Sequence, residues 1–519
     1  MSRTARFILF GTIFFTGAAV LIFEVAAVRA LSPYFGSSIY VVSSVLTIIL
    51  AALSLGYYFG GRLADKLPQV GVLYMVIGTS GLIMNVLFYF SQHIFPIAGS
   101  LFSITFGPLV LSAIFFLVPA FLLGIDSPFV IKLLTTEDDH EHNGAIVGST
   151  FFWSTVGSIV GSLISGFLLI PVLGLQLTFV GTATLLSLLS MSALFIVRLH
   201  TDEEIPLKHM QFVTATAVLS TLMAVVILNS SYLETKPGKL LYETDGYYSN
   251  IQIRERTDEN ENTIRTLYRE TNSASSIMTG TTTFVYRYSE YARSYRYLQE
   301  ETDSFLLIGG GAYTLPRTLL EEDSDLTMDV VEIEPSLYDL AVEYFELPES
   351  PRLTNHPVDG RIFLNTTDKK YDVIFADAFQ SGHFIPPHLI TKEFFENVAQ
   401  HLNDDGVFIA NVIGVTGQED QSLTGSLIKT IQSVFPALSM YSAQPYEDSM
   451  QNLMIVAKAD GSPVELPEDF IIDFKDGTYV PAEERRRSLD LLHLDNQVVF
   501  TDNLAPIEPL LAKQLIEYY

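Results

Sequence analysis

Long apolar runs dominate the first 230 residues of the chain, and shorter, more regular patterns dominate the rest. Seven runs are long enough to cross a bilayer as helices, and most charged residues lie between them. The first run is followed at once by another, which argues against a cleaved signal peptide. We therefore expect an α-helical transmembrane bundle over residues 1–230. Its spans should fall near 7–29, 39–60, 71–91, 100–124, 145–170, 175–197 and 209–229.

Small residues recur within these runs at the spacing of helix-packing motifs. The pairs are Gly56 and Gly60, Gly144 and Gly148, and Gly157 and Gly161. Glycines four residues apart let two helix backbones approach closely in lipid. We expect all three pairs to serve structural packing.

Glu24 lies inside the first apolar run, where a charged carboxylate is costly. The side chain should therefore be protonated or paired, and Arg29 lies five residues further along. Two interpretations stay open: a structural ion pair near a helix end, and a polar site or proton relay inside the bundle. The segment 56–65 (GYYFGGRLAD) resembles the cytoplasmic loop motif of major-facilitator transporters.

The distribution of Lys and Arg predicts an orientation in a cell membrane. One side of the expected bundle collects Arg3, Arg6, Arg62, Lys66, Lys132, Arg198 and Lys208. The positive-inside rule then places the N-terminus in the cytoplasm. The side of the C-terminal half stays open, because one crossing more or fewer reverses it.

Beyond about residue 231 the pattern becomes that of an α/β protein. Residues 247–254 and 263–269 alternate like strands around the polar turn 258–262, which predicts a β-hairpin. Helix-like sequence follows, so 231–300 should form a small β-hairpin and helical subdomain. From 301 to 519, short buried strands alternate with helices, the pattern of a parallel, doubly wound sheet. A late strand at 450–458 should be antiparallel and near an edge.

Composition limits the partners of this second half. Residues 1–229 hold 10 acidic and 8 basic residues, so nearly all of the net charge of −28 lies further on. Such an acidic domain repels nucleic acid, and we expect none as a partner. The chain has no cysteine, which excludes disulfides and zinc–thiolate sites, and we expect no metal.

Glycines and acids follow the ends of the predicted strands. They are Gly309, Gly310 and Gly311, then Glu332, then Asp359 and Gly360, and finally Asp377. In sheets of this kind, ligands bind beyond the carboxyl ends of the strands. Glu332 comes about 20 residues after the glycines, the spacing at which an acid bonds ribose hydroxyls. The set predicts a nucleoside-type site, whereas the dinucleotide fingerprint and the phosphate-binding loop motif are both missing.

The segments around these residues resemble the spermidine synthase (polyamine aminopropyltransferase) family, and more closely its branch fused to a multi-span membrane domain. They read FLLIGGG, VVEIEPSLYDLAVEYF, PRLTNHPVDGRIFL, YDVIFADAF and IPPHLITKEFF. The resemblance covers about 240–415. The segment TDNLAPIE at 501–508 looks like a recurrent ending of that branch.

The resemblance implies a Rossmann-like, methyltransferase-type open sheet that binds decarboxylated S-adenosylmethionine or a related adenosyl sulfonium. It implies a membrane-anchored aminopropyltransferase acting on a small amine in polyamine biosynthesis. In that reading the three glycines approach the methionine-derived part, Glu332 holds the ribose, and Asp359 with Gly360 holds adenine. Asp377 matches the family's general base, because a nearby carboxylate can orient an amine and take its proton.

Several positions depart from the family pattern on the amine side. Ser249 stands where the family usually has Gln, Ser289 where it has His, and Ala312 where it has Asp. The second acid usually found after the catalytic one is missing. His383 and His388, which flank the loop after Asp377, are interpreted as polar loop residues. The acceptor amine is therefore left open.

Two alternatives follow from these departures. The first is an S-adenosylmethionine-dependent methyltransferase that acts on a membrane-associated acceptor. The second is a non-enzymatic transporter or sensor, which Glu24 and the transporter-like segment motivate. Family members are commonly oligomers, so a homo-oligomer is left open as well.

Overall fold

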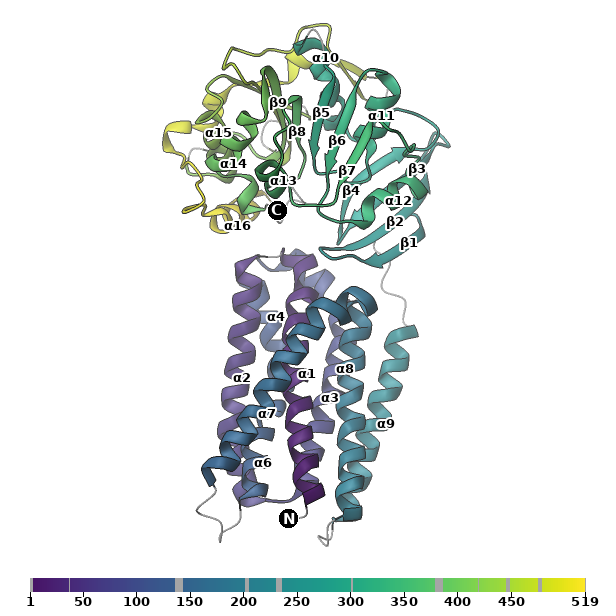
Figure 1. Ribbon diagram of the computed structural model, residues 1–519, viewed down its shortest axis with the longest axis vertical. Coiled ribbons are helices and arrows are strands. Elements are labelled where there is room, and N and C mark those ends of the chain that lie inside the picture. Colours follow the sequence, from purple (N-terminus) through teal and green to yellow (C-terminus); the bar gives the residue numbers. More distant parts are fainter. Residues whose placement is uncertain are drawn as a thin grey trace. The chain divides into compact units, whose positions relative to one another are not determined.

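The computed structural model describes residues 3–36, 38–135, 143–200, 205–229, 236–299, 302–378, 386–418, 420–444, 449–474 and 478–518. The chain divides into two compact units, Met1–Thr235 and Lys236–Tyr519. The first unit is helical, and the second is an α/β domain (Figure 1). The fold class predicted from the sequence is confirmed.

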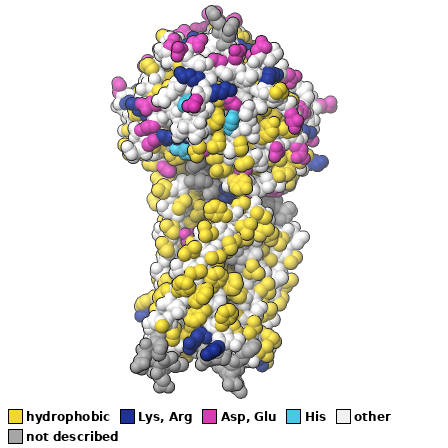
Figure 2. All heavy atoms as spheres, in the orientation of Figure 1, with side chains coloured by type: hydrophobic (Ala, Val, Ile, Leu, Met, Phe, Trp, Pro, Cys, Tyr) yellow, Lys and Arg dark blue, Asp and Glu magenta, His cyan; other side chains and the backbone are white. Residues whose placement is uncertain are grey.

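The helical unit contains long helices and three short ones of eight or nine residues each. They are α1 (Arg3–Phe35), α2 (Ile39–Lys66), α3 (Val70–Leu101), α4 (Gly107–Phe115), α5 (Leu117–Gly124), α6 (Asp126–Leu134), α7 (Asn143–Ile164), the π-helical turn η2 (Ser165–Leu169), α8 (Ile170–His200) and α9 (Leu207–Asn229). Six helical stretches among the described residues are long and apolar enough to cross a membrane. Figure 2 shows hydrophobic side chains over most of the visible face of this unit.

Six stretches replace the seven predicted spans because two predicted spans are joined, and one further span has different bounds. The stretch Asn143–Leu199 has 57 residues and contains two predicted spans, 145–170 and 175–197. They are separated by a break at Gly174 (φ 77°, ψ 169°), a conformation that glycine tolerates. The predicted span 100–124 is wrong in its bounds, because α3 continues to Leu101 and the matching stretch is Leu117–Leu134. Pro108, which has no N–H to donate, marks the start of a new helix at α4.

Two of the three glycine pairs lie at close helix contacts. A Cβ on Gly56 would stand 2.4 Å from the carbonyl oxygen of Phe121, and one on Gly60 2.7 Å from Cα of Ile125. These contacts bring α2 against α5 and α6. Gly157 and Gly161 pack on the backbone of α1 in the same way. A Cβ on Gly157 would stand 2.0 Å from a carbonyl oxygen of α1, and one on Gly161 would stand 2.3 Å from another.

The remaining glycine pair differs from expectation, whereas the role of the acid in the first helix stays open. A Cβ on Gly144 or Gly148 would meet nothing within 4 Å, so their expected packing role is wrong within the described residues. Glu24 is partly exposed on α1. No ion pair joins it to Arg29 in the part of the chain that the structure describes.

The α/β unit begins with a four-stranded antiparallel sheet. Its strands are β1 (Lys239–Asp245), β2 (Asn250–Thr257), β3 (Thr263–Arg269) and β4 (Asn272–Met278), in the order β1-β2-β3-β4. The predicted hairpin corresponds to β2 and β3, and β1 and β4 extend it on either side. The 3₁₀ helix η3 (Arg287–Ser294) and α10 (Tyr295–Leu298) then lead into the main sheet.

The main sheet has eight strands in the order β14-β10-β11-β9-β8-β5-β6-β7. The parallel strands are β5 (Ser304–Ile308), β6 (Thr327–Val331), β7 (Leu353–His356), β8 (Tyr371–Ala376) and β9 (Leu402–Gly414); β10 (Leu438–Ser442), β11 (Gln451–Lys458) and β14 (Arg486–Arg487) pair antiparallel. The late strand is therefore antiparallel, as predicted, with β10 and β14 between it and the edge. From β5 the chain builds toward β7 on one side and toward β9 on the other. This reversal of order at β5 and β8 is where open α/β sheets bind ligands.

Helices and small elements complete the unit. They are α11 (Thr314–Glu322), α12 (Ser336–Tyr344), α13 (Gly360–Thr366), η4 (Pro387–Leu389), α14 (Lys392–Gln400), α15 (Leu423–Gln432), β12 (Ile471–Phe474), β13 (Thr478–Pro481), η5 (Ala482–Arg485), η6 (Leu489–Leu492), η7 (Leu494–Asn496) and α16 (Ile507–Tyr518). The strands of the sheet centre are buried on both faces, with Phe305, Val373 and Ile409 fully inaccessible. Such strands read as continuous apolar runs, which is why their positions could be predicted.

Candidate nucleoside site at the end of β5

The glycine turn after β5 lies directly beside the end of β8. The Gly309 amide donates to the Val331 carbonyl at 2.9 Å, and the Asp377 amide donates to the Ile308 carbonyl at 2.8 Å. A Cβ on Gly309 would stand 2.5 Å from the carbonyl oxygen of Asp377. With φ at +102°, this position requires glycine for both its conformation and its close contact.

Glu332, at the end of β6, reaches back to the glycine turn. Its Oε2 accepts hydrogen bonds from the amides of Gly310 at 2.9 Å and Gly311 at 3.1 Å. Its Oε1 accepts from the Glu334 amide at 3.0 Å and lies 3.7 Å from Nη1 of Arg269. The carboxylate is almost fully buried, so these polar partners offset its desolvation.

Asp359 begins α13 as its N-cap. Its Oδ1 accepts from the amides of Arg361 at 2.9 Å and Ile362 at 3.1 Å, and its Oδ2 lies 2.7 Å from Nε2 of His388. Burial alone would raise the pKa of this carboxyl, but the bonds from His388 and the helix amides outweigh it and hold the pKa below its usual value. His388 therefore contacts a predicted site residue, whereas His383 lies outside the described residues.

Gly360 connects Asp359 to the end of β5. A Cβ at this position would stand 2.6 Å from Cγ2 of Ile308, so α13 starts against the strand that leads into the glycine turn. Through this contact the structure brings the start of α13 to the same sheet edge as the glycines. Among the residues that the structure describes, the Asp359 carboxylate bonds only to amides at the start of its own helix and to His388.

Asp377 has hydrogen-bond donors on both carboxylate oxygens. Tyr288 donates its hydroxyl to Oδ2 at 3.2 Å, and Asn411 donates its amide to Oδ1 at 2.7 Å. Asn452 in turn donates to Oδ1 of Asn411 at 2.9 Å, which fixes the orientation of that amide. Burial raises the pKa of Asp377 to about 7, against the lowering effect of these bonds, and the Glu332 charge adds to the increase.

The geometry brings together most of the residues predicted from the sequence. The three glycines, Glu332 and Asp377 meet where the strand order reverses, and Gly360 abuts the same strand. Arg269, Asn411 and Asn452 were not predicted. An Asn inside the buried run GVFIANVIG is the one available signal, because a buried amide needs partners.

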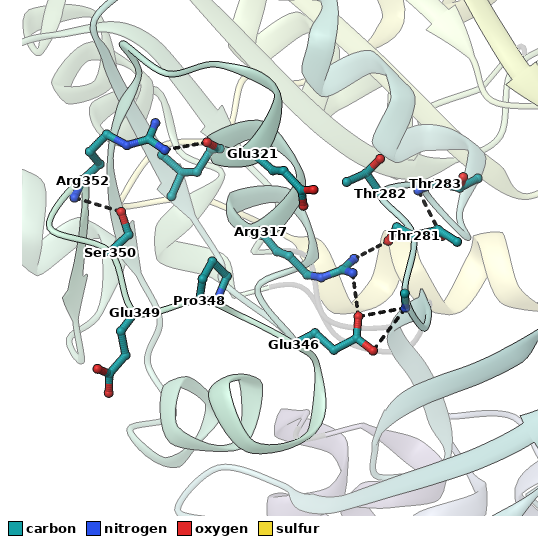
Figure 3. Close-up of a pocket in the computed structure, with 12 residues that line it drawn as sticks. Thr281, Thr282, Thr283, Arg317, Glu321, Glu346, Pro348, Glu349, Ser350 and Arg352 are labelled. Carbon is teal, nitrogen blue, oxygen red and sulfur yellow. Dashed lines mark hydrogen bonds and ion pairs between the residues drawn. The ribbon is translucent and has the colours of Figure 1, made fainter.

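A hollow of about 750 Å³ lies elsewhere in the α/β unit (Figure 3). Its lining comes from residues 280–283 after β4, from α11, and from the segment that leads into β7. Arg317 donates there to the Thr281 carbonyl and to Glu346, each at 2.7 Å. Arg317 and Glu346 already bind each other, and Arg352 donates to backbone carbonyls, so both basic side chains of this hollow are engaged within the domain.

Comparison with known proteins shows that part of the second unit matches a known family domain. Residues 292–465 match the spermine/spermidine synthase domain. A probable polyamine aminopropyl transferase of Bifidobacterium longum is 28% identical over 236 residues, which cover 44% of this chain and 51% of the relative. A polyamine aminopropyltransferase of Vibrio vulnificus is 34% identical over 136 residues, which cover 26% of this chain and 44% of the relative. The chain thus spans about half the length of these relatives.

Methyltransferases are also among the similar proteins. An N-terminal histidine N-methyltransferase of Emericella nidulans is 33% identical over 208 residues, which cover 37% of this chain and 35% of the relative. Among solved structures, a probable spermidine synthase from Corynebacterium glutamicum covers 52% of this chain with 18% identity and a TM-score of 0.42. Residues 292–465 of the second unit therefore match the spermine/spermidine synthase domain, and a helical unit with membrane-length apolar helices precedes them.

Proposed function

We propose that the α/β unit transfers an aminopropyl group from decarboxylated S-adenosylmethionine to an amine, and that the helical unit anchors it in a membrane. The observation that carries the proposal is Asp377, a partly buried carboxylate at the end of β8 with a pKa raised to about 7. A general base works best when its pKa lies near the working pH. The names of the two aminopropyltransferase relatives support the same reaction class.

The adenosyl part of the donor fits the residues at the sheet edge. Gly309 lets the glycine turn pack against the Asp377 backbone, where any side chain would clash, and Glu332 places a buried carboxylate where ribose hydroxyls are expected. Asp359 has lone pairs left beside its capping bonds and can accept from the adenine amino group. The acidic edge also favours a cationic sulfonium over a neutral ligand.

Asp377 would act on the acceptor nitrogen. As the nitrogen bonds to the aminopropyl carbon, the carbon–sulfur bond breaks and its electron pair stays on the sulfur of methylthioadenosine. The proton of the amine passes to Asp377. Tyr288 and Asn411 keep the carboxylate oriented toward the acceptor by holding both of its oxygens.

The exposed surface of the helical unit supports membrane anchoring. Large apolar side chains such as Phe7, Phe167 and Leu185 are 79%, 83% and 66% exposed, a pattern unusual for a protein surface in water. Arg3 and Arg6 at the start of α1 fit the positive-inside rule with a cytoplasmic N-terminus. Protease accessibility in sealed vesicles would test on which side the α/β unit lies.

An assay of the purified full chain tests the reaction. With decarboxylated S-adenosylmethionine and a panel of amines, the protein should release methylthioadenosine. Asp377→Asn should lower the rate about 100-fold or more, the usual size of general-base catalysis. Asp368→Asn, an exposed change of the same type, should leave the rate intact. Lack of release with every amine would contradict the proposal.

Methyl transfer from S-adenosylmethionine is the second candidate, because methyltransferases are among the relatives. Ala312 follows the glycine turn without a carboxylate that would select an aminopropyl ammonium group. Calorimetry separates the two candidates. Tighter binding of S-adenosylmethionine than of its decarboxylated form would favour methyl transfer, and the reverse would favour aminopropyl transfer.

A further inference from the structure

The segment TDNLAPIE (501–508) comes after β14, the last strand of the main sheet along the chain. It folds back onto the start of α13. Arg361, the second residue of that helix, donates Nη1 to Oδ1 of Asp502 at 2.7 Å and Nη2 to Oδ2 at 2.5 Å. Such a two-point contact between guanidinium and carboxylate fixes both position and orientation. Thr391 adds a third bond, from its hydroxyl to Oδ1 of Asp502 at 2.8 Å.

The turn that carries Asp502 is itself held by the domain. Thr501 and Leu504 exchange backbone hydrogen bonds of 2.9 and 3.0 Å, which closes a tight turn around Asp502. Phe500, just before the turn, is fully buried, and its carbonyl accepts from the Lys392 amide at 2.8 Å. The carboxylate is therefore presented by a fixed turn.

Arg361 links this turn to the candidate nucleoside site on two sides. Its own amide donates to Asp359, and Gly360 beside it packs on Ile308 at the end of β5. Its guanidinium also donates to the His388 carbonyl at 3.2 Å, while the His388 ring contacts Asp359. Asp502, Arg361, His388 and Asp359 thus form a continuous chain from the C-terminal segment to the expected adenine position.

We infer that the turn 501–504 is a positioning element of the nucleoside site, in which Asp502 holds Arg361 and thereby the Asp359–Gly360 start of α13 against β5. The inference rests on the proposed adenosyl-binding function and assigns a role to a segment outside the residues matched to the family domain, 292–465. Asp502 touches no ligand in this arrangement. Its effect passes through Arg361.

Charges around Asp502 fit this role. The hydrogen bond from Arg361 holds the pKa of Asp502 below its usual value, so the carboxylate is ionised at neutral pH. The Asp502 amide donates to Oε2 of Glu393 at 3.0 Å, which ties the turn to α14 as well. Loss of the carboxylate charge would leave the Arg361 guanidinium without its two-point partner and free the helix start to shift.

Binding of methylthioadenosine to the detergent-solubilised full chain tests the inference without knowledge of the acceptor. Asp502→Asn should weaken binding about fivefold, at the lower end of coupling between neighbouring sites. Asp502→Glu, which keeps the charge, should restore part of the affinity. Asp495→Asn is the matched control, since its side chain is exposed on η7, and it should bind like the wild type.

A double-mutant cycle distinguishes a positioning role of Asp502 through Arg361 from general destabilisation of the domain. If Asp502 acts through Arg361, Arg361→Gln and the double variant should show the same loss as Asp502→Asn, so the two effects do not add. Wild-type affinity in Asp502→Asn, or losses that add, would overturn the inference. If the wild type binds neither methylthioadenosine nor S-adenosylmethionine, the result contradicts the proposed function, and with it the positioning role of the turn 501–504.

Discussion

The amide of Asn411 donates a 2.7 Å hydrogen bond to the carboxylate of Asp377, across the boundary between β9 and β8. Asn452, from the antiparallel strand β11, donates to the other end of the same amide at 2.9 Å. Two strand residues and the residue just after β8 therefore form a chain of polar groups. The chain ends on the carboxylate with the raised pKa, so its members should control when that group is ionised.

Asn411→Leu should raise the pKa of Asp377 further, because it removes a donor that stabilises the ionised form. A hydrogen bond to a charged group contributes about 1.5–3 kcal/mol, which corresponds to a shift of about one to two pKa units. Proton uptake requires the ionised carboxylate, so activity should rise with pH through about 7 in the wild type. The rise should move to higher pH in the variant, measured as kcat/KM against pH.

Asn452→Ala should also move the profile of kcat/KM to higher pH, but by a smaller amount. Asn411 can still donate to Asp377, although Asn452 no longer fixes the orientation of its amide. Asn260→Leu, an exposed change in the turn between β2 and β3, serves as the control and should not alter the profile. A lower rate at every pH with an unchanged profile would show that Asn411 only supports the fold.

Asp377→Asn should stabilise the protein at neutral and higher pH. The pKa of Asp377 is raised in the folded state to about 7, above the ordinary aspartate value found in the unfolded chain. The folded state therefore binds a proton that the unfolded state has released, and stability falls as pH rises between about 4 and 7. The neutral amide avoids this loss.

Thermal unfolding of the wild type and of Asp377→Asn across this pH range would measure the effect. The difference in Tm should be small near pH 4 and should grow in favour of the variant toward pH 7 and above. An unchanged difference across the range would mean that Asp377 ionises at its ordinary pKa.

The sequence predicted those parts of the site that local patterns encode. Gly309 and Glu332 follow short buried strands, and the order of strands in an open sheet decides that their ends meet. The fold class followed from the same alternation. The wrong bounds of the fourth apolar span arose because hydropathy alone does not locate a helix break such as the one before Pro108.

The remaining contacts depend on pairings between distant segments. Asn411 and Asn452 meet because β9 and β11 are antiparallel neighbours, and Arg361 meets Asp502 across 141 residues of sequence. Neither pairing leaves a periodic or spacing signal in the chain. Arg269 reaches Glu332 from the separate antiparallel sheet for the same reason.

Gly309→Ala should abolish binding of adenosyl ligands and destabilise the domain. The new Cβ would lie 2.5 Å from the carbonyl oxygen of Asp377, in a backbone conformation with φ at +102°. This clash would push apart the ends of β5 and β8, and the site requires these two strand ends to be adjacent. Calorimetry with methylthioadenosine and thermal unfolding would measure both effects.

Gly280→Ala is the control for Gly309→Ala, because Gly280 has φ at +72° but nothing within 4 Å of a new Cβ. The Gly280→Ala variant should lose about 1–2 kcal/mol of stability through backbone strain alone, and its ligand affinity should stay unchanged. Equal losses in both variants would show that strain alone, rather than the contact with Asp377, explains the effect.

Gly60→Leu should destabilise the helical unit, because its Cβ would stand 2.7 Å from Cα of Ile125 and backbone atoms cannot rotate away. Gly148→Leu provides a matched change in the same unit, with no atom within 4 Å of the new Cβ. Since helix association in lipid depends on close packing at small residues, the first change should lower Tm and the yield of folded protein extracted in mild detergent. The second should leave both near the wild-type values. Equal behaviour of the two variants would contradict the contact of α2 with α5 and α6 on which the prediction rests.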